Sequence, residues 1–207
     1  MYKKFFKRFI DIVLSGCGIL VLAVPMLLIA LAVKLDSKGP VLFWQKRVAI
    51  HKDTYMMPKF RSMYTTAPAN MPTHMLTSPD QWITPVGKFL RKTSLDELPQ
   101  LFSIFKGDMS IVGPRPALWN QYDLIAERDK YGANDIRPGL TGWAQINGRD
   151  ELPIDVKARF DGEYVEKLSF AMDCKCFFGT IVKVLKHDGV VEGGTGTMKE
   201  KEEEVKK

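Results

Sequence analysis

At 207 residues and 45% hydrophobic content, the chain can form one compact domain with its own core plus an attached segment. Its net charge of +6 is uneven, because residues 1–60 carry ten Lys and Arg against three acids, about +7, and leave about −1 for the rest. This basic excess flanks a long apolar segment, so a membrane surface accounts for it better than nucleic acid does, and no zinc-finger spacing or basic-aromatic RNA motif is found. The three cysteines form neither a complete metal-site pattern nor a disulfide framework, which is typical of reduced thiols in a cytosol-facing protein.

The apolar segment covers residues 12–33, about the 20 residues that a membrane-spanning helix needs. A cleaved signal peptide is disfavoured, because the apolar run exceeds the usual 7–15 residues and Asp11 interrupts the approach to it. A spanning helix would have basic residues on both sides, although the positive-inside rule needs an asymmetry. Pro25, near the middle, removes a helical hydrogen bond, so a helix that breaks there and returns to the same face is equally consistent with the sequence.

The rest of the chain predicts a mostly helical α+β domain with short strands. Strands are expected at 41–44 and 56–61, a long surface loop at 64–85, helices at 98–106 and 117–131, and a glycine-punctuated loop at 137–149. Two later apolar stripes, at Phe160, Tyr164 and Leu168 and within 177–185, indicate helices that pack on the core, or, for the second, lie in a membrane interface. The predicted organisation is a membrane-embedded helix at 1–38 broken near Pro25, a cytosol-facing domain with interfacial helices at 39–190, and a flexible tail at 191–207.

Two adjacent carboxylates, Asp96 and Glu97, precede the helix expected at 98–106. Ser94 and Glu97 match a capping box, in which Glu97 would only satisfy a backbone N–H. Pro99 argues against that register. With Ser94 as N-cap, Pro99 would be at position N5 and could not donate the helical hydrogen bond expected there. With Asp96 as N-cap, Pro99 would be at N3, where the backbone N–H has no partner in the helix and no hydrogen bond is lost. In the second register the helix dipole would keep Asp96 ionised and attract phosphate, so capping and catalysis both remain open on spacing alone.

Several basic residues occur beside Pro, Gly or strand-like residues rather than on amphipathic helix faces. These are Lys59, Arg61, Arg91, Arg115, Arg137 and Arg149. Arg115 lies between two prolines, which hold it rigidly. Because guanidinium groups match phosphate oxygens in shape and charge, several of them together would bind a diphosphate.

Four strings carry a resemblance to a known family. They are KFRSM at 59–63, RKTSLDELPQLF at 91–102, KGDMSIVGPRP at 106–116 and RPGLTGWAQINGR at 137–149. Together they resemble the bacterial sugar transferase family, the monotopic polyprenyl-phosphate phosphoglycosyl transferases, over about residues 7–189. The chain is similar in size to the family's small form. Val24 stands where members often have Ser before the helix-breaking proline, and the altered surroundings of Asp161 leave the role of that acidic position open.

The resemblance implies a re-entrant helix broken at Pro25 on the cytoplasmic face of the bacterial inner membrane. It implies transfer of a sugar-1-phosphate from a UDP-sugar to polyprenyl (undecaprenyl) phosphate in two steps, with Asp96 as nucleophile and UMP as leaving group. Glu97 would hold Mg²⁺, and the basic residues named above would bind phosphates. A homodimer is allowed, and the sugar expected is N-acetylated, deoxygenated or an amino sugar, with UDP-galactose or UDP-glucose as the next choice. The competing hypothesis is a membrane-tethered, non-catalytic module whose arginines bind lipid headgroups or nucleotides.

Overall fold

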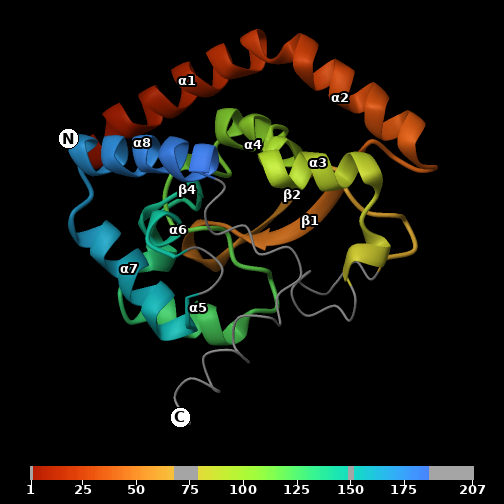
Figure 1. Cartoon of the computed structure of the whole chain (residues 1–207). Helices are drawn as coiled ribbons and strands as arrows, with labels where there is room; N and C mark the ends of the chain where they lie inside the picture. Colours follow the sequence, from red (N-terminus) through yellow and green to blue (C-terminus); the bar gives the residue numbers. More distant parts are fainter. Residues whose placement is uncertain (1, 68–78, 149–151, 187–207) are drawn as a thin grey trace.

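The computed structural model describes residues 2–67, 79–148 and 152–186, and its N-terminal part is a long bent helix (Figure 1). Helix α1 (Lys7–Val21) and helix α2 (Ala23–Asp36) meet at Leu22, whose backbone leaves regular helical geometry. Pro25 has no N–H to donate to the preceding turn, which is a usual cause of a kink at this position. The bend therefore falls one turn before the break predicted at Pro25. By length and composition alone, Lys7–Asp36 could cross a membrane.

Both arms of this helix descend from an apex onto the globular part of the protein (Figure 1). Helix α1 packs along α4 (Gln100–Lys106), and α2 packs on α3 (Pro85–Thr93). A Cβ atom on Gly16 would lie 3.4 Å from the Phe105 ring, and one on Gly18 would lie 3.3 Å from Leu101. The absence of side chains on these two glycines thus lets α1 approach α4 closely.

Polar contacts fix α1 to the globular part. Asp11 is buried and accepts hydrogen bonds from Ser110 Oγ at 3.1 Å and from the Ile111 backbone N–H at 2.9 Å. Nearby, Asp173 accepts one from Lys7 Nζ at 2.6 Å and one from the Tyr164 hydroxyl at 2.5 Å. Asp11, which disfavoured a signal peptide, therefore connects the apolar helix to the globular domain through hydrogen bonds.

Two small sheets lie beneath the helices. Strands β1 (Leu42–Val48) and β2 (Thr54–Phe60) form an antiparallel hairpin, with β1 longer than the predicted 41–44. Strands β3 (Ser110–Val112) and β4 (Gly139–Thr141) pair in parallel, so part of the predicted glycine-punctuated loop is a strand. A Cβ on Gly139 would lie 2.1 Å from the Gly113 nitrogen, so this close approach of two backbones requires glycine.

The remaining helices differ from the sequence prediction in two places: a helix at Trp143–Ile146 lies within the loop expected at 137–149, and the helix expected at 117–131 is shorter. They are α5 (Tyr122–Asp129), α6 (Trp143–Ile146), α7 (Ile154–Glu166) and α8 (Phe170–Lys186), with a short 3-10 turn at Pro79–Trp82. The helix predicted for 117–131 begins only at Tyr122, because Ala117 accepts a hydrogen bond from Val48 and Leu118 bridges to Arg47 at the end of β1. Half of the predicted loop at 64–85 (residues 68–78) and the whole predicted tail at 191–207 lie outside the described residues.

The two apolar stripes have different surroundings. Tyr164, from the first stripe, is buried in a core cluster with Val112, Met172 and Cys176. From the second stripe, Phe178 is 62% exposed and Phe177 is 40% exposed. Helices α8, α4 and α3 lie in one layer directly below α1 and α2 (Figure 1). The exposed aromatic and aliphatic side chains of this layer and of the two arms include Phe9, Leu20, Leu27, Phe89, Phe102, Phe105, Phe178 and Val182.

Candidate active site

The two carboxylates lie in a 3-10 turn, Leu95–Glu97, between helices α3 and α4. Ser94 ends α3 with φ of 57° and ψ of 18°, in the left-handed region, and donates its N–H to the Arg91 carbonyl at 3.1 Å. A left-handed conformation is uncommon for a residue other than glycine and is often found near functional sites. This turn redirects the chain so that Asp96 and Glu97 face the hairpin and the loop after β3.

Neither capping register is present. Helix α4 begins at Gln100 with Pro99 as its N-cap, so the prediction that Asp96 caps the helix was wrong. A separate 3-10 turn precedes α4 because the left-handed backbone of Ser94 interrupts the helical path. The capping box is absent as well, since the Glu97 side chain contacts Lys59 and Arg115. The end of the helix was predicted correctly, because Gly107 follows Lys106 in the left-handed region.

Glu97 is the centre of a buried charge cluster. Lys59 Nζ on β2 lies 2.9 Å from Glu97 Oε1, and Arg115 Nη2 lies 2.7 Å from the same oxygen. The glutamate side chain is only 12% exposed. Burial alone would raise the pKa of Glu97, but the charges and hydrogen bonds of Arg115 and Lys59 outweigh it and hold the pKa well below its usual range. Glu97 is therefore ionised at neutral pH.

Asp96 is also buried, at 8% exposure, but its electrostatic balance differs. Burial raises the pKa of Asp96, the Glu97 charge adds to that effect, and the positive charges of Lys59, Arg91 and Arg115 oppose it. A carboxylate held in a desolvated position beside cations is a more reactive nucleophile than one in water. The neighbouring carboxylates thus have distinct environments, with Glu97 paired to cations and Asp96 held under a desolvation penalty.

The predicted basic residues divide into two groups. Lys59 and Arg115 meet at Glu97, and Arg91, at the end of α3, donates from Nε to Ser62 Oγ at 2.9 Å and adds positive charge near Asp96. Arg137 instead donates to the Gly107 carbonyl at 2.9 Å, in contact with α4's end. Arg149 lies outside the described residues.

Arg61 also lies apart from the carboxylate pair. Its guanidinium group is buried and donates to the carbonyls of Pro40 at 2.6 Å and Ser37 at 2.8 Å. A longer contact reaches the Val33 carbonyl at 3.3 Å. These acceptors belong to the end of α2 and the segment after it, so Arg61 satisfies carbonyls that the helix leaves unpaired.

Sequence reasoning overlooked two polar residues beside this cluster. Arg47 on β1 and Gln100 on α4 line a small pocket together with Met57, Arg115 and Pro116. Arg47 lies two residues after Gln45, so strand periodicity would have placed both on one face of the hairpin had β1 been predicted to full length.

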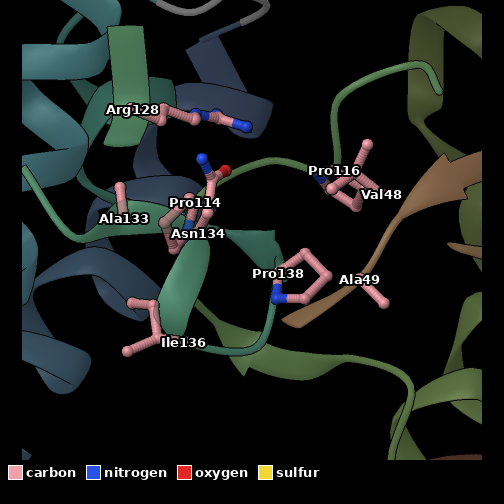
Figure 2. Close-up of a pocket in the computed structure, with 9 residues that line it drawn as sticks. All are labelled: Val48, Ala49, Pro114, Pro116, Arg128, Ala133, Asn134, Ile136 and Pro138. Carbon is pink, nitrogen blue, oxygen red and sulfur yellow. The ribbon is translucent and has the colours of Figure 1, made fainter. Parts of the chain in front are cut away.

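A second pocket borders the loop that carries Arg115, since Pro114 and Pro116 line it (Figure 2). It is lined by Val48, Ala49, Pro114, Pro116, Arg128, Ala133, Asn134, Ile136 and Pro138. One of these residues, Arg128, has its Nη2 2.6 Å from Asp161 Oδ2, and both side chains are almost fully buried. Asp161 therefore joins α7 to α5 through a buried ion pair.

The predicted Mg²⁺ has a partial set of ligands here. Within residues 2–67, 79–148 and 152–186, no three His, Cys, Asp or Glu side chains are grouped as metal ligands. Mg²⁺ is often bound by one or two carboxylates that share it with substrate phosphates. Glu97 Oε1 is engaged by two cations, whereas Oε2 has a longer contact of 3.5 Å with Arg115 Nη1. Oε2 therefore fits a metal ion that arrives with a diphosphate.

The fold and the site combine a bent apolar helix above an α+β domain with a buried acid pair that has basic side chains beside it. A profile described as bacterial sugar transferase matches residues 2–187. The chain belongs to the bacterial sugar transferase family.

Named relatives show the same likeness. The chain is 42% identical over 188 residues to the UDP-glucose:undecaprenyl-phosphate glucose-1-phosphate transferase of Escherichia coli (strain K12), covering 87% of this chain and 40% of that protein. It is 35% identical over 200 residues to the undecaprenyl-phosphate galactose phosphotransferase of Salmonella typhimurium, covering 90% of this chain and 42% of that protein. An uncharacterized sugar transferase of Bacillus subtilis is 37% identical, with 89% of each chain covered. The chain thus spans less than half the length of the Escherichia coli and Salmonella typhimurium relatives.

Proposed function

We propose that this protein transfers a sugar-1-phosphate from a UDP-sugar to polyprenyl phosphate, giving polyprenyl diphosphate sugar and UMP. The observation that carries the proposal is the buried Asp96 beside the Glu97–Lys59–Arg115 cluster. Two substrate-named relatives act on undecaprenyl phosphate by their printed names, which supports the same acceptor class here.

The reaction has two steps. First, an Asp96 carboxylate oxygen attacks the sugar-proximal phosphorus, the bond from that phosphorus to the bridging oxygen breaks, and UMP leaves with the electron pair. A phosphosugar then remains on Asp96 as an acyl phosphate. Second, an oxygen of polyprenyl phosphate attacks the same phosphorus, the phosphorus–Asp96 bond breaks, and the carboxylate is restored. Lys59 and Arg115 stabilise the negative charge on the transferring group in both steps.

Glu97, and in particular its Oε2, is the residue that would hold Mg²⁺. The ion supplies neutralisation of the diphosphate charge when it is bound. Lys59 and Arg115 would bind oxygens of the diphosphate while they keep Glu97 ionised and in place.

The apolar layer supports a position at the membrane. Both arms of the bent helix carry exposed apolar side chains, and so do α3, α4 and α8 directly below them (Figure 1). An exposed apolar surface of this kind marks a site that a membrane or another protein covers. We propose that the helix enters and leaves the same leaflet, on the cytoplasmic face of the bacterial inner membrane, and that the acceptor's phosphate reaches Asp96 there.

Asp96→Asn separates this function from a non-catalytic lipid- or nucleotide-binding module. The purified variant is expected to bind UDP-sugar without releasing UMP, whereas release at the wild-type rate would overturn the nucleophile assignment. A panel with UDP-N-acetylated, deoxygenated and amino sugars beside UDP-glucose and UDP-galactose identifies the donor. The two hexoses belong in it because they are the sugars in the relatives' names.

A further inference from the structure

One face of the β1–β2 hairpin continues the site beyond Glu97. Cross-strand partners share a face, and Phe43 is opposite Lys59, Gln45 opposite Met57, and Arg47 opposite Tyr55. Lys59 therefore lies on the same face as Arg47, two cross-strand pairs along the hairpin. The cation that contacts Glu97 and the cation that sequence reasoning overlooked are thus aligned along one surface.

The pocket between them contains hydrogen-bond donors. Arg47, Arg115 and Gln100 line it, with Met57 and Pro116 completing the wall. Gln100 is 2% exposed, and its Nε2 amide has no hydrogen-bond partner among the described residues. Leaving a buried donor unpaired costs about 1–3 kcal/mol, so such a group in a native site indicates an absent ligand or water.

The walls of this pocket are held in place. Arg47 donates from Nη1 to the Pro116 carbonyl at 2.9 Å, and Gln45 Oε1 accepts from Arg47 Nη2 at 2.6 Å. Pro116 follows Arg115, so the strand fixes the loop from which Arg115 reaches Glu97. Arg115 contacts Glu97 and also lines the pocket, so it joins the pocket to the acid pair.

We propose that this pocket is an oxyanion subsite, in which Arg47 and the Gln100 amide bind an oxygen of a phosphate group other than the one that Asp96 attacks. The assignment rests on the proposed function. In a diphosphate the second phosphate is joined to the attacked one through a single bridging oxygen, so it must lie beside Asp96, and Arg115 connects the acid pair to this pocket. The pocket is small, which suits one phosphate oxygen. Guanidinium and amide donors match that oxygen, and no carboxylate is among its lining residues.

Two sources supply such a phosphate: the nucleotide and the polyprenyl phosphate. Binding of UDP, uridine and farnesyl phosphate to detergent-solubilised protein, measured by calorimetry, separates them. Gln100→Leu and Arg47→Met are the test variants, and Lys46→Met is the matched control because Lys46 is exposed on the other face of β1. Gln100→Leu keeps the test informative if loss of the Arg47–Pro116 contact unfolds the other variant.

A nucleotide subsite predicts that Gln100→Leu weakens UDP binding about tenfold, while uridine binding and the Lys46→Met control stay at wild-type values. A loss confined to farnesyl phosphate assigns the subsite to the lipid phosphate instead. Unchanged affinity for both phosphates in a folded Gln100→Leu protein overturns the proposal and assigns the pocket to a structural water. Because binding is measured without turnover, failure of the aspartyl mechanism would appear separately, as UMP release by Asp96→Asn.

Discussion

Lys59 and Glu97 are 38 residues apart in the chain, yet Lys59 Nζ lies 2.9 Å from Glu97 Oε1. The contact joins the hairpin to the turn between α3 and α4, and Arg115 completes it from the loop after β3. Three segments that resemble family motifs thus meet at one carboxylate. The neighbouring Asp96 is left with a different electrostatic environment, and the predictions below depend on that difference.

The two carboxylates should affect stability with opposite signs. For Asp96, burial raises the folded-state pKa above the ordinary 3.8. Between 3.8 and the folded-state pKa, the folded state keeps a proton that the unfolded state has lost. Stability therefore falls as pH rises from 3.8 to the folded-state pKa. Asp96→Asn removes this penalty and should raise Tm at pH 7. The gain should shrink as pH falls toward 3.8. Thermal unfolding at pH 4–8 measures it, and a lower Tm for the variant at pH 7 would contradict the description of Asp96.

Glu97→Gln should have the reverse effect. The folded-state pKa of Glu97 lies below the ordinary 4.5, so its stabilisation is complete above pH 4.5 and is lost as pH falls through the folded-state value. The variant leaves Lys59 and Arg115 without their buried carboxylate, which costs on the order of 3 kcal/mol at pH 7. Denaturant unfolding at neutral and acid pH tests this. A cost that does not diminish on acidification would contradict the ion-pair explanation.

Arg61 and Arg115 should respond differently to replacement by methionine. Arg61→Met leaves carbonyls at the end of α2 unpaired and should lower the free energy of unfolding by about 3 kcal/mol. KM for the UDP-sugar should remain unchanged in the folded fraction. Arg115→Met should instead raise KM or lower kcat by about tenfold or more, because it removes a phosphate-binding group. A raised KM for a stable Arg61→Met protein would restore Arg61 to the substrate site.

The bent helix can be tested by labelling. In a background with Cys17→Ser and Cys174→Ser, where the buried Cys176 is inaccessible, single cysteines replace Lys3 and Lys38 on either side of the apolar helix. A re-entrant helix places both on the cytoplasmic side, so a membrane-impermeant maleimide should label both in inverted vesicles and neither in spheroplasts. Labelling of the two positions from opposite sides would establish a spanning helix.

The local signals in the sequence predicted much of this architecture. Strand-like runs predicted parts of β1 and β2, Lys106-Gly107 predicted the end of α4, and Pro25 predicted a break within one turn of the observed one. These features depend on a few neighbouring residues, whose backbone preferences act wherever they occur. The meeting of Lys59 and Arg115 with the acid pair came from family motifs rather than from spacing.

Features that depend on distant contacts were beyond local reasoning. Arg61 binds carbonyls of Val33 and Ser37, and nothing in its own neighbourhood distinguishes it from a phosphate-binding arginine. The helix was predicted to start at Asp96 because Pro99 would then lose no hydrogen bond. The left-handed turn at Ser94 was not foreseen, and α4 begins at Gln100. Arg47 was overlooked because β1 was predicted to end at Trp44.

The central claim is that Asp96 carries the phosphosugar between the two steps. Wild-type protein incubated with its UDP-sugar and no polyprenyl phosphate, then examined by intact-protein and peptide mass spectrometry, tests this most directly. We predict a mass increase equal to one sugar-phosphate, located on Asp96, with one UMP released per protein and no adduct in Asp96→Asn. Release of UMP only when the lipid acceptor is present, with no adduct under any condition, would contradict the account.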